Sequence, residues 1–247
     1  MPRLIPFRLA AVCALAFTLL LSTAALAVAK VPAELRVVGA GKTIAEATLK
    51  TGTISVPTSH KATCFGKGTA GSGKAATIKG ATALGLLGQA AKSTSALKPL
   101  LLTDAFDFGL GICGVGGFKA TSKLSWYLKV NHKNPELGGD AVKLKAGDEV
   151  LWALEPYPYP NELSLVAPNT VAPGVPFDVR VFSYSDKGKR KPAAGVTVTG
   201  ASGPTDAEGR TSATVTESTT LIATHGKDIP SSQVSVSACA GVCPLGS

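Results

Sequence analysis

The stretch Leu124–Val130, LSWYLKV, contains the strongest fold signal in this chain. Apolar residues such as Trp126 and Leu128 alternate with Tyr127 and Lys129, so the two sets point to opposite sides of an extended backbone. A period of two residues is typical of a β-strand with one side in a core. The pattern predicts a strand with an apolar face and a polar face that carries Tyr127.

The same alternation recurs further along the chain, where Val150, Trp152 and Leu154 form another apolar face. Upstream, the runs AELRVV (33–38) and TLKTGTISV (48–56) are also rich in β-prone residues. These segments predict a mostly antiparallel sheet.

One helix stands out between these strands, in the run GATALGLLGQAAKSTSAL (80–97). Leu84, Leu87 and Ala90 recur at helical spacing, and Thr82 precedes them as a candidate N-cap. Together with the strands, this helix predicts an α+β domain over residues 30–154.

The run EPYPYPN (155–161) divides the chain, because its three prolines favour an extended connector and exclude a helix. Beyond it, short β-prone runs separated by turn residues predict an immunoglobulin-like β-sandwich over residues 162–238, followed by a cysteine-containing tail, 239–247. The predicted fold class is therefore mostly β. The runs are ELSLV, FDVRVFSY, GVTVTG, TSATVT, TTLIATH and QVSVSA.

The N-terminus predicts export. Arg3 and Arg8 flank the start of a short apolar run, and small residues follow it, so residues 1–27 read as a signal peptide. The sequence leaves open whether cleavage follows Ala27 or Ala29. No later apolar run is long enough to cross a bilayer, so we expect a secreted or extracellular protein, associated with the cell wall or free.

Outside the predicted signal, four cysteines remain, which suggests disulfides in an exported protein. Three pairings are possible. The three-residue gap between Cys239 and Cys243 favours that pair, which leaves Cys64 for Cys113. A zinc site is the rival interpretation, but no histidine pair has ligand spacing relative to the cysteines.

The chain is basic, with a formal net charge of +9 that falls to +7 without Arg3 and Arg8. Its densest cationic run is KGKRK (187–191). This run reads either as a solvated hairpin tip or as an attraction site for anionic wall polymers or membrane surfaces. Nucleic acid is not expected, because the chain offers neither a basic helix nor an aromatic stacking platform.

The run GTAGSGKA (68–75) nearly matches a phosphate-binding loop. Ala75 stands where a magnesium-binding hydroxyl is needed, and the following AATIKG predicts a strand rather than a helix. We therefore interpret the run as a loop near Cys64 and not as a nucleotide site.

The runs SWYLKVN (125–131) and LKAGDEVLW (144–152) resemble a bacterial extracellular domain of unknown function, which is related to the C-terminal domain of transcobalamin and intrinsic factor. The resemblance covers about residues 35–154, and the helix at 82–92 falls where that family places one. It raises corrinoid binding as a hypothesis. The large helical domain that supplies the other half of that family's binding site is absent from this chain.

The run GVTVTGASGPTDAEGRTSATV (195–215) is similar to bacterial immunoglobulin-like repeats of surface proteins. That resemblance implies a spacer or an adhesive unit. Neither resemblance implies a catalytic residue, and we expect no metal site and no cofactor.

Three aromatic residues are candidates for stacking on a flat ligand: Trp126, Tyr127 and Trp152. The alternative is that the two tryptophans belong to the core, since both lie on apolar faces, and that Tyr127 is an ordinary surface residue.

Catalysis has little support in the sequence. His60, His132 and His225 are each expected at the surface, and no G-x-S-x-G motif surrounds any serine. The leading hypothesis is a non-catalytic interaction or adhesion protein whose partners are cell-wall polymers or surface proteins. A binder of a small flat, corrinoid-like ligand is the alternative, and an undetected hydrolase or wall-modifying enzyme is the second.

Overall fold

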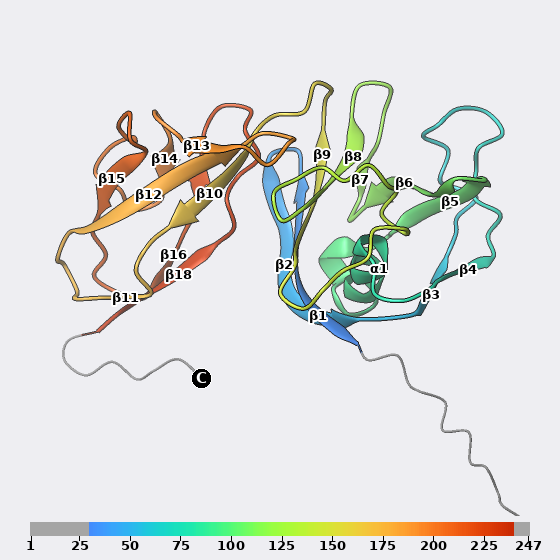
Figure 1. Cartoon of the computed structure of the whole chain (residues 1–247), viewed down its shortest axis with the longest axis horizontal. Coiled ribbons are helices and arrows are strands. Elements are labelled where there is room, and N and C mark those ends of the chain that lie inside the picture. Colours follow the sequence, from blue (N-terminus) through green and yellow to red (C-terminus); the bar gives the residue numbers. More distant parts are fainter. Residues whose placement is uncertain (1–29, 240–247) are drawn as a thin grey trace, which may run out of the picture.

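A computed structural model describes residues 30–239 and confirms a mostly-β protein with one α-helix. Its two halves lie side by side along the long axis of the molecule (Figure 1). The first half contains β1 to β9 and the helix, and the second contains β10 to β18. The predicted signal peptide lies outside the described residues. Within residues 30–239, no helix has the length and apolar character needed to span a membrane.

The main sheet of the first half has four strands in the order β2, β1, β9, β8. Both outer pairs are antiparallel, whereas the central β1 and β9 run parallel, with Leu35 opposite Val150. A parallel pair needs a long crossover between its strands, and the chain from β2 to β8 supplies it. The strands are β1 (Val31–Gly39), β2 (Lys42–Thr51), β8 (Ser125–Val130) and β9 (Glu149–Glu155).

The helix α1 (Ala83–Ser93) packs across β1, β2 and β3. Thr82 caps it as predicted, because its hydroxyl accepts a hydrogen bond of 3.0 Å from the backbone N–H of Gly85. Gly88 has little helix propensity, but a Cβ there would lie 2.7 Å from Val56 Cγ1. The missing side chain lets the helix approach β3 closely. A 3₁₀ turn, Ser95–Leu97, follows the helix.

The run 48–56, predicted as one strand, is divided in the structure. Thr51 ends β2 opposite Val31, and Ile54 begins β3 opposite Ile78 in a separate hairpin. Gly52 lies between the two strands, where the chain passes from one sheet to the next. The remaining strands of this half are β3 (Ile54–Pro57), β4 (Ala75–Ile78), β5 (Leu101–Phe106), β6 (Gly109–Val115) and β7 (Phe118–Lys119).

A disulfide joins Cys64 to Cys113 across a sequence separation of 49 residues, as predicted. It ties the loop before β4 to strand β6. Cys243, and with it the expected pairing with Cys239, lies outside the described residues.

The glycine-rich run 68–75 is held by a carboxylate. Asp104 accepts hydrogen bonds from the Ser72 backbone N–H at 2.7 Å and from the Ser72 hydroxyl at 2.6 Å. These two bonds hold the pKa of Asp104 below its ordinary value. The Ser72 backbone N–H, which a phosphate-binding loop would offer to its ligand, is therefore bonded to the Asp104 carboxylate. Ala75 begins strand β4, in line with the predicted strand after this loop.

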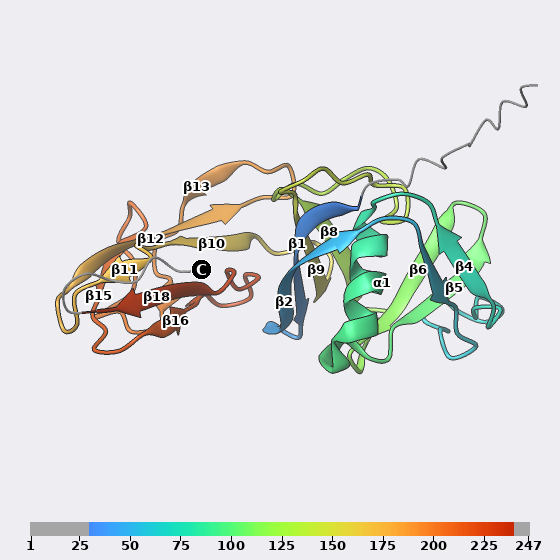
Figure 2. The same cartoon turned by 90° about the horizontal axis from the view of Figure 1, so that it is seen from below.

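The second half encloses its own core between short strands (Figure 2). All six predicted runs contain strands, and β11 and β13 are additional. One sheet joins β10 (Glu162–Val166), β12 (Phe177–Tyr184), β13 (Arg190–Pro192) and β15 (Arg210–Ala213). The others contain β11 (Thr170–Val171), β14 (Thr197–Val198), β16 (Thr219–Leu221), β17 (Ala223–Thr224) and β18 (Val234–Ala238).

The polar face of LSWYLKV is buried, which corrects the prediction for Tyr127. Tyr127 is 3% exposed and Lys129 is fully buried, because the second half covers this side of the main sheet. Tyr127 packs with Leu151 and Ile229 in a small cluster that spans both halves. The main sheet is therefore covered on both faces, by α1 on one side and by the second half on the other.

Candidate functional site

A cavity of about 570 Å³ opens beside β8 and β9, and Trp126, Tyr127 and Trp152 all contribute to its wall. This volume lies within the usual range for small-ligand pockets. The three aromatic residues that the sequence singles out therefore all border this cavity, although the Tyr127 side chain packs on the other side of β8, against the second half. We call it the aromatic cavity.

The two tryptophans have different surroundings. Trp152 is 5% exposed and belongs to the main core, with its Nε1 donating a hydrogen bond of 3.4 Å to the Ala83 carbonyl oxygen. Trp126 is only partly buried, and its Nε1–H finds no acceptor within residues 30–239. Trp152 is thus mainly a core residue, as the alternative interpretation expects, while Trp126 is only partly buried at the cavity wall.

Exposed apolar side chains gather at the mouth of the aromatic cavity. Phe108 is 82% exposed, Leu137 63% and Phe65 50%, and all three contribute to the cavity wall. Phe106 stacks on Phe108 with ring centroids 4.8 Å apart and meets Phe65 edge to face at 5.2 Å. Gly111 permits this arrangement, because a Cβ there would lie 2.6 Å from the Phe65 ring. Neither Phe65 nor Phe108 stands out in the sequence, because each lies in a turn without apolar periodicity.

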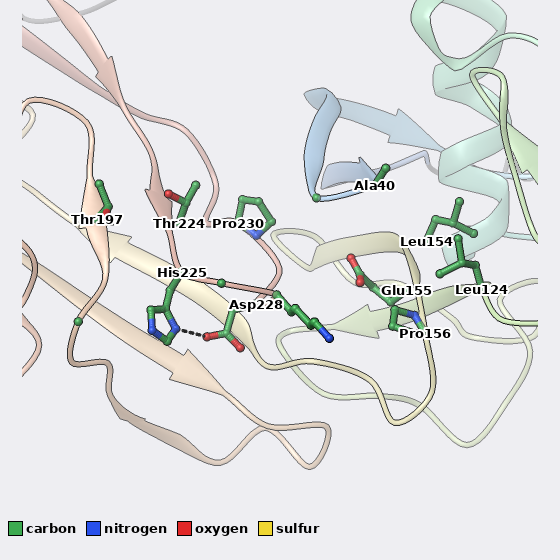
Figure 3. Close-up of a pocket in the computed structure, with 14 residues that line it drawn as sticks. Ala40, Leu124, Leu154, Glu155, Pro156, Thr197, Thr224, His225, Asp228 and Pro230 are labelled. Carbon is green, nitrogen blue, oxygen red and sulfur yellow. Dashed lines mark hydrogen bonds and ion pairs between the residues drawn. The ribbon is translucent and has the colours of Figure 1, made fainter.

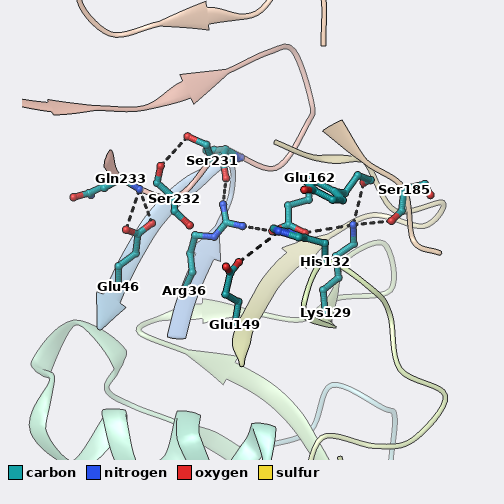
Figure 4. A network of polar contacts seen from close by, with 12 residues as sticks. Arg36, Glu46, Lys129, His132, Glu149, Glu162, Ser185, Ser231, Ser232 and Gln233 are labelled. Atoms are coloured by element: carbon teal, nitrogen blue, oxygen red, sulfur yellow. Dashed lines mark hydrogen bonds and ion pairs between the residues drawn. The ribbon is translucent and has the colours of Figure 1, made fainter. Parts of the chain in front are cut away.

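A network of buried charges joins the two halves on the other side of β1 and β8 (Figure 4). The Arg36 guanidinium donates to a Glu162 carboxylate oxygen and to the Pro230 carbonyl oxygen. The Lys129 ammonium donates to the carbonyl oxygens of Tyr184 and Ser185, at 3.1 and 3.2 Å. It also lies 3.6 Å from the second Glu162 oxygen.

His132 belongs to this network, which corrects its prediction as a surface residue. Its Nδ1 lies 3.1 Å from Glu162 Oε1, and its Nε2 lies 3.5 Å from the more exposed Glu149 Oε2. Its ring stacks on Tyr184 with centroids 3.8 Å apart. The side chain of His132 is 20% exposed.

Three groups in or beside the network, Glu162, Lys129 and Tyr127, have shifted pKa values. Burial alone would raise the pKa of Glu162, but the contact with His132 and the positive charges of Arg36 and Lys129 outweigh it, so this pKa lies below its ordinary value. Burial lowers the pKa of Lys129, and the negative charge of Glu162 partly offsets this lowering. Burial, together with a hydrogen bond of 2.6 Å from the Tyr127 hydroxyl to Asp186, raises the pKa of Tyr127.

The charged network has no room for a substrate. The adjoining space, lined by Arg36, His132, Glu149 and Glu162, is only about 20 Å³. It accommodates about one water molecule. The contacts of Glu162 with Arg36 and Lys129 therefore link the two halves.

A larger cavity of about 610 Å³ lies between the halves near the end of β9 (Figure 3). On one side His225 Nδ1 lies 3.0 Å from Asp228 Oδ2, and on the other Glu155 points its carboxylate into the space. The hydroxyls on its described wall come from Thr197 and Thr224, with no serine or cysteine. His225 is exposed as predicted, and so is His60.

Glu155 is 7% exposed, and its carboxylate forms no hydrogen bond or ion pair with any other described residue. Burial raises its pKa from 4.5 to about 7. The folded state therefore holds this proton more tightly than the unfolded state does. The free energy of unfolding is expected to fall as the pH rises from about 4.5 through about 7.

We expect Glu155→Gln to remove this pH dependence. The gain in unfolding free energy relative to the native protein should be about 2–3 kcal/mol larger at pH 8 than at pH 5, measured by urea denaturation. Glu34→Gln, at an exposed position of β1, is the control and should show no such difference. An equal offset at both pH values for Glu155→Gln would mean that the carboxylate is not held protonated.

Within residues 30–239, no group of three or more histidine, cysteine, aspartate or glutamate side chains lies in a position to hold a metal ion. No protein-family model, curated protein or solved structure matches the chain. The likeness to the transcobalamin-related domain and to immunoglobulin-like repeats therefore remains an expectation from the sequence.

Proposed function

We propose that this chain is a non-catalytic binding protein and that the aromatic cavity receives a small, flat, ring-containing ligand. One observation carries the proposal. Among residues 30–239, six large hydrophobic side chains are exposed, and three of them, Phe65, Phe108 and Leu137, line this one cavity. Exposed apolar side chains that cluster around a hollow mark interaction sites, whereas isolated ones need no explanation.

The chemistry of the wall favours a ring system over a flexible polar ligand. Trp126, Phe65 and Phe108 contribute aromatic rings to the wall, and Leu110 and Leu137 add aliphatic surface. Polar groups are few and include the side chain of Asn134, which donates to the Leu128 carbonyl oxygen at 2.9 Å. A flat ligand would gain burial and stacking here, and an acceptor atom on its edge would pair with the Trp126 Nε1–H, which has no partner among residues 30–239. A corrinoid, suggested by the sequence resemblance, is one member of this class.

Variants at the mouth test the proposal. The probes are cobinamide and a planar aromatic dye, and binding is measured by quenching of tryptophan fluorescence and by calorimetry. Phe108→Ser combined with Leu137→Ser should weaken binding of the bound probe at least about tenfold, because two apolar walls are lost. Tyr157→Ser is the matched control, since Tyr157 is also 82% exposed but lies outside the cavity.

Two results would oppose the proposal. The first is that neither probe binds the native protein at millimolar concentration. The second is that Tyr157→Ser weakens binding as much as the cavity variant does. If the protein is retained by cell-wall material and binds neither probe, the result favours the adhesion hypothesis instead.

A further inference from the structure

Two arginines lie over one phenylalanine on the outer face of the second half, and a third arginine lies on the neighbouring strand. Phe182 is at the centre, with the Arg190 guanidinium carbon 3.4 Å and the Arg180 carbon 4.8 Å from its ring centroid. Arg210 lies directly opposite Arg180 across β12 and β15. We call Arg180, Arg190 and Arg210 the arginine face.

Strand alternation explains why these side chains share a face. Val179 and Val181 of β12 are buried in the core of the second half, so the residues between and beyond them point outward. Directly opposed residues of antiparallel strands lie on the same side of a sheet. Arg210 is opposite Arg180, and Arg190 is opposite Tyr184, so both join the outward set.

The positive charge of this face is not neutralised within the described residues. The ion pairs between residues 30 and 239 include none of the three arginines. Arg180 Nε donates only to the Glu208 carbonyl oxygen, at 3.3 Å. Like charges directly opposite each other, as in Arg180 and Arg210, destabilise a strand pair. An anion bound between them would remove that repulsion.

A hollow of about 310 Å³ lies at this pair. Arg180 and Arg210 contribute to its wall, together with Val166, Pro168 and one carboxylate, Asp178. Two guanidinium groups against one carboxylate leave an excess positive charge at the hollow. Guanidinium groups are planar donors that match the oxygens of carboxylate and phosphate groups in pairs.

The basic run 187–191 extends the same charge. Lys187, Lys189 and Lys191 are exposed in and beside the turn from β12 to β13, which ends at Arg190 of the arginine face. Lys187 also forms a backbone bridge with Lys133 of the first half, so the run is not only a free hairpin tip. The turn therefore places further exposed positive charges next to Arg190 along the chain.

We propose that the arginine face binds an anionic glycopolymer through its repeated carboxylate or phosphate groups. Nucleic acid fits less well, because Phe182 is 7% exposed beneath the arginines and leaves no open ring for a base. A membrane fits less well too. Among the residues that line the hollow, Val166 is the one large exposed apolar side chain, which is a small anchor for insertion. The predicted export would place the face against such polymers.

Binding is measured on the purified protein at 50 mM and 200 mM salt, with polygalacturonate as the carboxylate probe and poly(glycerol phosphate) as the phosphate probe. At least one probe should bind. The variant Arg180→Gln/Arg190→Gln/Arg210→Gln should weaken that binding at least about tenfold and make its salt dependence shallower by about two in log–log slope.

The matched control removes the same charge elsewhere. Lys50, Lys119 and Lys145 are exposed in the first half, and replacing all three with glutamine should change affinity less than about threefold. Thermal melting checks that the arginine variant is folded, and Arg190→Gln alone provides a milder version.

The proposal is overturned by three results. The first is that neither polymer binds at 50 mM salt, and the second is that the lysine control loses as much affinity as the arginine variant. The third is that a single-stranded oligonucleotide or an anionic phospholipid vesicle binds more tightly than both polymers. Any one of them is sufficient. Because the aromatic cavity lies in the first half, each result leaves the proposed ligand site untouched.

Discussion

Replacing Glu162 with glutamine is expected to lower the free energy of unfolding by about 3–5 kcal/mol, because two buried cations would lose their counter-charge. Arg36 and Lys129 lie in the interface between the halves, and Glu162 is the carboxylate that contacts both. Its own side chain is 2% exposed, so water cannot replace it. Urea denaturation at pH 7 gives the change in unfolding free energy.

Glu149→Gln is the matched control. Glu149 lies 3.5 Å from the same imidazole, His132, but its side chain is 53% exposed. Solvent screens such a pair, so the expected loss is below about 1 kcal/mol. Equal losses for the two variants would show that the buried network does not hold the halves together.

A triple variant distinguishes two causes of the lost unfolding free energy, the uncompensated buried charge and the loss of packing. Arg36→Met, Lys129→Met and Glu162→Leu in one chain would replace the charged cluster with apolar side chains of similar size. We expect this triple variant to be more stable than Glu162→Gln alone, because no uncompensated charge remains buried.

Replacing Cys64 and Cys113 with alanine is expected to cost about 4 kcal/mol of unfolding free energy, the value for a loop of this length in the chain-entropy model. The bridge spans 49 residues of sequence, so the unfolded chain gains much freedom without it. Cys113 is buried with Ala62 and Leu101, and its loss also leaves space in that small cluster. Thermal and urea denaturation measure the change.

The same variant links stability to the proposed ligand site. Phe65 follows Cys64 directly and lies at the mouth of the aromatic cavity. Without the bridge, Phe65 should be less well positioned, and binding of the fluorescence probe should weaken as well. Thr63→Ala, at an exposed neighbouring position, should change neither property appreciably. A loss below about 1 kcal/mol in the double cysteine variant would contradict the entropic argument.

Several local features could be read from the sequence because their causes are local. Alternation in LSWYLKV marks a strand through its two-residue period, and Thr82 caps the helix three residues before the amide that it binds. Ala75 rules against a magnesium-binding loop by its chemistry alone. The pairing of Cys64 with Cys113 followed from an even count and from the short gap between the other two cysteines.

The burial of Tyr127 could not be predicted from the local sequence. Alternation distinguishes two faces by polarity, but it does not reveal that a second half covers the polar one. Tyr127 stacks on Tyr159 with ring centroids 3.8 Å apart and donates to Asp186, which lies 59 residues away in the sequence. A tyrosine with such partners has the same local sequence pattern as a solvent-exposed one.

The sequence by itself determined the strand periods, the helix with its cap and the cysteines available for pairing, since each depends on residues close together or on simple counting. Only the tertiary structure decided that Arg36, Lys129 and Glu162 meet between the halves, and that Phe65, Phe108 and Trp126 share one cavity. The physical reason is that burial and charge pairing depend on which distant strands become neighbours. Arg36 and Glu162 are 126 residues apart along the chain, and no local pattern records their contact.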